Sequence, residues 1–378
     1  MTNDNAWLAD YIDQGSRGQL EAPPFASWIV TRACNLTCYY CFANARKRDP
    51  DELSTAEAKT VLEDLAAHGV FLVNFLGGEP LMRRDIYELI DHASDLGVYA
   101  TILTNGTLVR NDTVSRLKDV GCQMIGVSVD SHDPEVHDSV RGKKGSLAAA
   151  MRTVHETVAA GIRCSVRLVV TEASLPAIPE LFRWALDEGV EELIVIPIFM
   201  VGRAAGSADD RRADILGKQY FAQALETLRE LADPLGLSVP REDLACTIGI
   251  ELNPPQGEHH HAGHAIGFER TTGCKVGRFA VNIQPNGDVH SCPFVHYNIG
   301  NLRRQSIAEI WQHPLLNKSR NEDLGCHARS IIHLGRPDVR DPTYGRSTEE
   351  LLAALPAGAQ AERPGLTFVS LDQVITPS

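Results

Sequence analysis

The sequence predicts an α/β protein whose main domain is a partly open barrel of six strand–helix units. Three observations lead to this prediction. Short apolar runs alternate with helix-like stretches from about residue 27 to about residue 200, and there are six such runs. The runs are nearly continuous in apolar residues, as in parallel strands that are buried on both faces. A closed barrel of eight units would need two further strands.

The expected strands, in chain order, are Ser27–Thr31, Phe71–Phe75, Val98–Leu103, Cys122–Val129, Ile162–Thr171 and Leu193–Ile198. The expected helices between them are Thr55–His68, Arg84–Leu96, Asp112–Val120, Ser146–Ala160 and Ile178–Glu188. The first of these helices is preceded by Ser54 and carries Glu57 three residues later, which is the pattern of a capping box.

The strand–helix alternation ends near residue 203. Ile215–Ala232 is expected to form one more helix, after which the chain becomes irregular and rich in Gly, Pro and His. Phe279–Ile283 and Val289–Cys292 predict a hairpin, because the turn between them contains Asn286 followed by Gly287. Thr348–Ala354 is expected to be a short helix in a surface tail. These changes divide the chain into an N-terminal extension (1–24), the barrel (25–232), a small second domain (233–345) and a C-terminal tail (346–378).

The composition is that of a soluble globular protein, and the protein is expected to be cytoplasmic. Of the 378 residues, 43% are hydrophobic and 22% are charged, and the formal net charge is −13. An acidic chain is not expected to coat nucleic acid. The first residues are acidic rather than apolar, and no run of eighteen apolar residues occurs, so neither an export signal nor a membrane span is expected. In a reducing compartment, clustered cysteines indicate metal or redox chemistry rather than disulfides.

Three cysteines lie close together in C-N-L-T-C-Y-Y-C, directly after the first expected strand. Cys34, Cys38 and Cys41 are spaced by three residues and then by two. Loops at the carboxyl ends of parallel strands commonly carry the active site. Three thiolates bind either zinc or an iron–sulfur cluster, and three ligands leave one iron of a four-iron cluster free. Buried structural zinc, or cysteines that only fill the core, are the alternatives.

This motif resembles that of the radical SAM family, in which an aromatic residue, here Tyr40, precedes the last cysteine. The resemblance implies a partial (β/α)6 TIM-like barrel and a [4Fe–4S] cluster held by Cys34, Cys38 and Cys41. The open iron would bind the amino and carboxylate groups of S-adenosylmethionine. An electron from a donor such as flavodoxin or ferredoxin would release a 5′-deoxyadenosyl radical, which takes a hydrogen atom from carbon.

Two further loops resemble motifs of the same family. Gly77, Gly78, Glu79 and Pro80 follow the second strand, where the family holds the methionine amino group. The glycines would allow close approach of the backbone to a ligand, and Glu79 would accept from the amine. Asn105 follows the third strand and is also expected to contact the cofactor, although a plain turn is the alternative reading of both loops.

The fourth strand ends in a Ser-x-Asp pattern that is followed by Arg-Gly. In the resemblance, Ser128 would bond the ribose, and Arg141 would grip the methionine carboxylate as a planar fork. The alternative is a polar strand end and a surface arginine. His132 and His137 are expected to be solvated loop residues.

A second set of cysteines, Cys274, Cys292 and Cys326, resembles parts of the SPASM domain, which holds auxiliary iron–sulfur clusters. The chain lacks several other cysteines of that domain, which implies a truncated, twitch-like version with one auxiliary [4Fe–4S] cluster. The fourth ligand is open among Cys246, His327, a histidine of 259–264, and the substrate. Zinc, or loss of the cluster, is the alternative.

The resemblance is strongest to the branch that matures haem and mycofactocin. The leading expectation is hydrogen abstraction from a small natural product, sugar-like or otherwise, leading to epimerisation or dehydrogenation. In an epimerase, Cys246 would be the catalytic hydrogen donor. A peptide or tetrapyrrole side chain is the second expectation. A peptide is placed second because peptide-modifying relatives often carry an N-terminal peptide-recognition domain, and only about twenty-four residues precede the first strand here. The rival class is a non-catalytic iron–sulfur or zinc protein.

Overall fold

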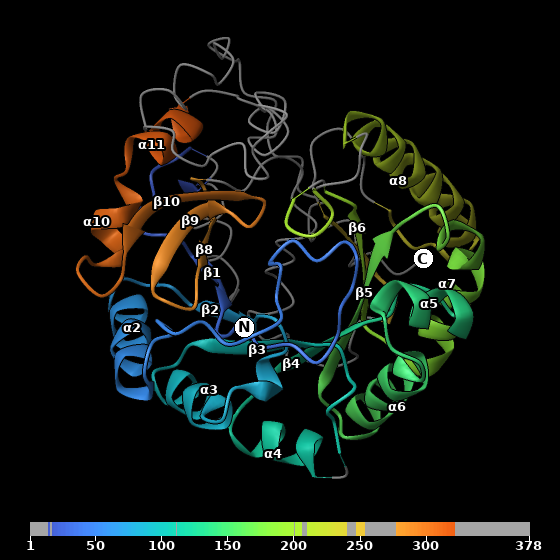
Figure 1. The fold of residues 1–378 in the computed structure, drawn as a ribbon, viewed down its shortest axis with the longest axis horizontal. Helices are drawn as coiled ribbons and strands as arrows, with labels where there is room; N and C mark the ends of the chain where they lie inside the picture. The colour runs from blue at the N-terminus through green and yellow to red at the C-terminus, as the bar shows by residue number, and fades with distance from the viewer. Residues whose placement is uncertain are drawn as a thin grey trace, which may run out of the picture.

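The computed structural model describes residues 14–15, 17–110, 112–199, 201–205, 210–239, 247–253 and 277–321. One ten-stranded sheet runs through these parts in the order β10-β9-β8-β1-β2-β3-β4-β5-β6-β7 (Figure 1). Its centre is six parallel strands, which confirms the predicted α/β barrel. β1 and β6 are not paired with each other, so the six-stranded barrel is open between them.

The six parallel strands follow the predicted order. Their bounds are β1 (Phe25–Ile29), β2 (Leu72–Leu76), β3 (Tyr99–Thr104), β4 (Met124–Ser128), β5 (Arg163–Val170) and β6 (Glu192–Pro197). The helices that follow them are α2 (Thr55–Ala67), α3 (Ile86–Asp95), α4 (Thr113–Asp119), α6 (Ser146–Ala159), α7 (Ile178–Glu188) and α8 (Asp210–Ala232). These helices form the outer ring in Figure 1. Ser54 and Glu57 make both hydrogen bonds of the predicted capping box.

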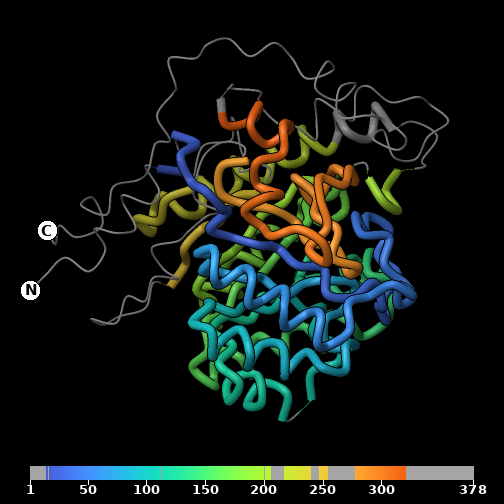
Figure 2. The backbone as a smooth tube through the Cα atoms, turned by 90° about the vertical axis from the view of Figure 1, so that its left-hand side faces the viewer, coloured from blue at the N-terminus to red at the C-terminus, as the bar shows by residue number. Residues whose placement is uncertain are grey.

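The C-terminal part of the described chain extends the same sheet at both edges. β7 (Ile248–Glu251) pairs antiparallel with β6, and β8 (Ala280–Ile283) pairs parallel with β1. β9 (Asp288–Cys292) and β10 (Val295–Asn301) then continue the sheet beyond β8. The β8–β9 pair is the predicted hairpin. α10 (Ile307–Trp311) and α11 (Pro314–Asn321) follow, and Figure 2 shows this segment, in orange, beside the first strands, in blue.

The two faces of the barrel strands differ in polarity. Val73 and Phe75 of β2 are buried in the core that the sheet shares with the helices. Asn74 between them points to the opposite, inner face, because side chains alternate along a strand. There it accepts a hydrogen bond from Thr101 Oγ1 of β3 at 3.0 Å. The outer face therefore builds the core, and the inner face carries polar groups.

Among the elements that were not predicted are one strand and one helix. β7 is a four-residue strand, and α5 (Pro134–Arg141) is an eight-residue helix between β4 and α6. α5 buries His137, which corrects the expectation of a solvated loop residue. The Nδ1 atom of His137 accepts a hydrogen bond from the backbone N–H of Asp130 at 3.2 Å. Within the described residues, no helix has the length and apolar character needed to cross a membrane.

Candidate functional site

The cysteine loop connects β1 to α2 at the carboxyl end of the barrel strands. It folds back on itself, because Cys34 N–H donates to the Arg46 carbonyl at 3.3 Å and Ala33 bridges to Arg46. Cys38 is buried, and Cys34 and Cys41 are partly buried. Cys34 and Cys41 pack against a small buried cluster of Ile29, Ala43 and Ala45.

Burial is the main influence on the pKa of the Cys34 and Cys38 thiols. It raises the pKa of Cys34 to about 11, and negative charge on Glu79, Cys38 and Cys41 adds to this shift. Burial likewise raises the pKa of Cys38. Among the described residues, no three His, Cys, Asp or Glu side chains already converge as metal ligands. The donor set is nevertheless suited to a soft metal, since a bound metal takes the place of the thiol protons.

The glycine loop after β2 lies directly against the start of the cysteine loop. Gly78 N–H donates to the Thr31 carbonyl at 2.7 Å, and Glu79 N–H donates to the Ala33 carbonyl at 2.8 Å. A Cβ atom on Gly78 would overlap the Ala33 carbonyl oxygen. The close approach that the glycines allow is therefore to the chain's own backbone, one residue before Cys34.

Glu79 is fully buried, with an exposed fraction of 0%. Its carboxylate accepts from Thr104 Oγ1 at 2.8 Å, from Asn105 N–H at 2.8 Å and from Leu81 N–H at 3.2 Å. These are neutral donors, and burial still raises the pKa of Glu79 to about 7. Pro80, also buried, begins a short 3₁₀ turn (Pro80–Met82). The carboxylate thus lies in a buried setting with neutral hydrogen-bond donors and without a cationic partner among the described residues.

The side chain of Asn105 forms hydrogen bonds with other residues of the protein. Its Nδ2 donates to Asn35 Oδ1 at 3.0 Å, and its Oδ1 accepts from Thr107 N–H at 2.9 Å. Asn35 Nδ2 closes the ring by donating to Thr107 Oγ1 at 2.7 Å. Asn105 therefore connects the end of β3 to the cysteine loop.

Asp130, two residues after β4, organises the other side of the cysteine loop. It is fully buried and accepts from Arg141 Nε at 2.6 Å and Arg141 Nη2 at 2.9 Å. The Tyr40 hydroxyl and the Val169 N–H also donate to it, the latter at 3.1 Å. The fork of Arg141 that was expected for the methionine carboxylate is thus occupied by Asp130. The Ser-x-Asp pattern contained this aspartate, but its role was not predicted.

Arg203, in the loop after β6, donates hydrogen bonds to three carbonyl groups of the cysteine loop. Its backbone N–H donates to the Cys41 carbonyl at 3.0 Å, and its Nε donates to the Cys38 carbonyl at 2.8 Å. Its Nη1 donates to the Ala45 carbonyl at 2.7 Å. The cysteine loop is therefore fixed by contacts with the loops that follow β2, β3, β4 and β6.

The inner face of strands β4 and β5 also carries polar side chains. Ser128, the last residue of β4, is partly buried and pairs in register with Arg167 of β5. Arg167 lies on the inner face, since Val166 and Leu168 on either side of it belong to the core. The hydroxyl of Ser165 is buried and has no hydrogen-bond partner among the described residues. This face offers polar groups to a ligand inside the barrel.

The second cysteine set is only partly within the described residues. Cys292 is buried at the end of β9, whereas Cys246, Cys274 and Cys326 lie outside the described residues. Phe294, two residues after Cys292, stacks on Phe199 with ring centroids 3.8 Å apart and meets the Phe42 ring edge-on at 5.7 Å. Since Phe42 follows Cys41, these rings link the hairpin to the cysteine loop.

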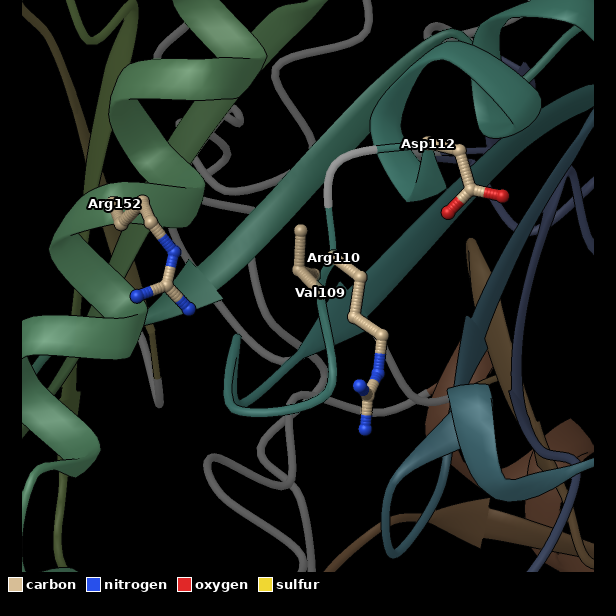
Figure 3. A pocket seen from close by; sticks show the side chains of 4 residues that line it. All are labelled: Val109, Arg110, Asp112 and Arg152. Carbon is tan, nitrogen blue, oxygen red and sulfur yellow. The ribbon is translucent and has the colours of Figure 1, made fainter.

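A separate pocket lies at the outer rim of the barrel, between the loop after β3 and α6. It is lined by Val109, Arg110, Asp112 and Arg152 (Figure 3). In Figure 3, Arg152 extends from α6 and Arg110 from the loop after β3, with their guanidinium groups lying apart from each other. The pocket contains no cysteine and is a basic surface feature rather than part of the site.

Comparison with known proteins identifies the family. The model of the radical SAM superfamily matches residues 28–185, which include the cysteine loop, and that of an iron–sulfur cluster-binding domain, SPASM, matches residues 274–329. The Fe-coproporphyrin III synthase of Methanosarcina barkeri is 31% identical over 317 residues, covering 82% of this chain and 77% of the relative. The chain belongs to the radical SAM superfamily. Mycofactocin maturase MftC of Mycolicibacterium smegmatis is also 31% identical, covering 82% of this chain and 75% of the maturase.

The fold agrees with this assignment. SuiB of Streptococcus suis, in its crystal structure with the precursor peptide SuiA, superposes with a TM-score of 0.63 at 18% identity, covering 90% of this chain and 79% of that one. Membership of the radical SAM superfamily implies a [4Fe–4S] cluster and S-adenosylmethionine, and the SPASM domain implies an auxiliary iron–sulfur cluster. The chain is therefore a radical SAM enzyme with relatives in the predicted haem and mycofactocin branch.

Proposed function

We propose that Cys34, Cys38 and Cys41 hold the [4Fe–4S] cluster and that this radical SAM enzyme abstracts hydrogen from a carbon atom of a tetrapyrrole side chain or a peptide. The observation that carries the site assignment is Glu79. Glu79 is fully buried and has no cationic partner among the described residues, which is costly for a carboxylate. Its backbone N–H also donates to the Ala33 carbonyl at the start of the cysteine loop, a position that suits the amino group of S-adenosylmethionine. Three neutral donors leave acceptor capacity on this carboxylate for one further N–H group.

When bound, the cluster and S-adenosylmethionine supply a 5′-deoxyadenosyl radical that removes a hydrogen atom from carbon. The residues of the chain position and shield this chemistry. Arg203 and Asn105 fix the cysteine loop through its carbonyl groups and Asn35, and Gly78 keeps the β2 loop in contact with it. Such a rigid frame favours a reproducible distance between the cofactor and the substrate.

For the methionine carboxylate, Arg167 is a second candidate beside Arg141. Both guanidinium nitrogens that would form the fork of Arg141 already donate to Asp130. Arg167 lies on the inner face of β5, in register with Ser128, the residue expected beside the ribose. We therefore expect Arg167→Gln to weaken binding of S-adenosylmethionine by about tenfold or more, the effect of losing a charge-assisted hydrogen bond.

The choice of substrate class rests on the relatives. Their names specify Fe-coproporphyrin III synthase, haem synthase, pre-haem d1 synthase and mycofactocin maturase. The sugar-like substrate expected first from the sequence has no support among these names, so tetrapyrroles and peptides come first. Epimerisation stays a narrower proposal, in which Cys246 donates the hydrogen atom. Full epimerisation by Cys246→Ala would contradict that role.

The experiment is anaerobic reconstitution with iron and sulfide, followed by dithionite and S-adenosylmethionine, with release of 5′-deoxyadenosine and methionine as the readout. A flavodoxin or ferredoxin replaces dithionite in a second series, since we propose one of these as the electron donor. Substrates deuterated at side-chain carbons, either carboxylated tetrapyrroles or short peptides, are then added. Deuterium in 5′-deoxyadenosine identifies the substrate class.

Two cysteine variants provide the matched comparison. Cys38→Ala should abolish release of 5′-deoxyadenosine, because it removes a cluster ligand. Cys164→Ala removes a thiol that is also buried, on the outer face of β5, and should leave release within about twofold of the wild type. Equal activity of the two variants would contradict the ligand assignment.

A further inference from the structure

Arg141 reaches the sulfur atom of Cys38 as well as Asp130. It is the last residue of α5, and its Nη1 lies 3.9 Å from Cys38 Sγ. Its Nε and Nη2 donate to the two oxygens of Asp130 at 2.6 and 2.9 Å. Because the guanidinium group is planar, this two-point contact also fixes the direction of Nη1. The sulfur contact is therefore set by Asp130.

The neighbours of this pair reinforce the same orientation. The Tyr40 hydroxyl donates to Asp130, and the Tyr40 ring lies beneath the guanidinium group, 5.5 Å from ring centroid to Cζ. At the end of α5, the Arg141 carbonyl accepts from Thr37 N–H at 3.2 Å, and the Val140 carbonyl accepts from Tyr39 N–H at 3.4 Å. These two bonds hold the residues immediately before and after Cys38. The helix end thus fixes the backbone around Cys38 while its last side chain approaches the sulfur.

We propose that Arg141 is a positioning residue that donates a hydrogen bond from Nη1 to the sulfur of Cys38 and thereby raises the reduction potential of the cluster. This inference rests on the proposed ligand role of Cys38. A reduced cluster carries one more negative charge than an oxidised one, so a cation and a hydrogen bond at a ligand sulfur favour reduction. Arg141 would then serve the cluster rather than the methionine carboxylate.

Arg203 offers a matched control because it holds the same cysteine in a different way. It donates to the Cys38 carbonyl oxygen at 2.8 Å, whereas the hydrogen bond to the Cys38 sulfur comes from Arg141. Both arginines therefore restrain Cys38, and Arg141 also donates a hydrogen bond to its sulfur. A loss of restraint alone should appear in both variants, whereas a change in potential should appear in one.

The test is a potentiometric titration followed by electron paramagnetic resonance on the reconstituted, substrate-free protein. The signal that changes on addition of S-adenosylmethionine identifies the cluster of interest. The variant is Asp130→Asn with Arg141→Gln, in which no buried charge is left unpaired. We expect its electron-transfer equilibrium to shift about tenfold toward the oxidised cluster, ~59 mV for one electron. Arg203→Gln should keep the wild-type potential but lose iron faster to a chelator.

Several outcomes would overturn the inference. An unchanged potential in the double variant would do so, as would an equal shift in Arg203→Gln. If the unchanged potential comes with about tenfold weaker binding of S-adenosylmethionine, Arg141 is instead the partner of the methionine carboxylate. If the double variant binds no iron, Arg141→Lys replaces it, and a potential at or above the wild-type value overturns the inference. A wild-type protein that binds no iron contradicts the proposed function itself.

Discussion

Glu79 and Asp130 are both fully buried carboxylates beside the cysteine loop, yet their partners differ in charge. Glu79, after β2, accepts three hydrogen bonds from neutral donors. Asp130, after β4, is bound by the guanidinium group of Arg141 at two points. In a buried ion pair the two charges neutralise each other within the protein, whereas neutral donors do not neutralise the charge of a buried carboxylate. The Asp130 side therefore supports the loop, and the Glu79 side is better suited to receive a ligand.

The largest expected effect is the loss of Asp130. Asp130→Ala leaves the guanidinium group of Arg141 buried without its carboxylate, which costs about 3–5 kcal/mol in the free energy of unfolding. Urea denaturation of the metal-free protein measures this cost. The double variant with Arg141→Met removes both charges and should recover part of the loss. A double variant less stable than Asp130→Ala would contradict the comparison, because the ion pair would not be what the site depends on.

The fold was largely predictable from the sequence, because buried parallel strands are continuous apolar runs. All six strands begin and end within two residues of their predicted bounds. α5 was not predicted, since Pro134–Arg141 is short and rich in charged residues, and its helical form depends on the fixed ends at Asp133 and Gly142. β10 was also not predicted, because register shifts interrupt its alternation.

The site was predictable in its positions but not in its contacts. The motifs located the cysteine loop, Glu79 and Arg141, because each follows a predicted strand or lies at a recognisable spacing. They did not reveal that Asp130 occupies the fork of Arg141, or that Arg203 holds Cys38 from 165 positions away along the chain. Such pairings depend on how the loops pack together, which local patterns do not encode.

The second effect is a pair of opposite pH dependences on the two sides of the loop. The pKa of Glu79 is raised to about 7 by burial, so the native state binds its proton more tightly than the unfolded state. Its contribution to stability is fully present below about pH 4.5 and is lost as the pH rises through 7, by about 3 kcal/mol. Glu79→Gln removes this dependence.

His137, which accepts from the Asp130 N–H, behaves in the opposite way. Burial lowers its pKa to about 4, so the native state holds it neutral while the unfolded state binds a proton below about pH 6.5. Stability should therefore fall as the pH drops from 6.5 to 4, by about 3 kcal/mol. His137→Gln keeps an acceptor and removes the titration.

Urea denaturation of the metal-free protein between pH 4 and 7.5 tests both dependences. Relative to the wild type, Glu79→Gln should gain stability as the pH rises, and His137→Gln should gain it as the pH falls. Slopes of the same sign in the two variants would show that the two sides do not differ in the way described.

The smallest expected effect concerns Tyr40, whose hydroxyl donates to Asp130 on the better satisfied side. Tyr40→Phe removes one of the donors to this carboxylate but leaves Arg141 and the Val169 N–H in place. The expected loss is about 1 kcal/mol in the free energy of unfolding, the usual net value of one hydrogen bond. Thr104→Val removes one donor from Glu79 and provides the counterpart, since no cation of the described residues compensates that carboxylate. Thr104→Val should raise the apparent pKa of Glu79. At pH 7.5 it should also lower the free energy of unfolding by more than Tyr40→Phe does, because the charge of Asp130 is already neutralised by Arg141. A smaller loss in Thr104→Val than in Tyr40→Phe would contradict the comparison.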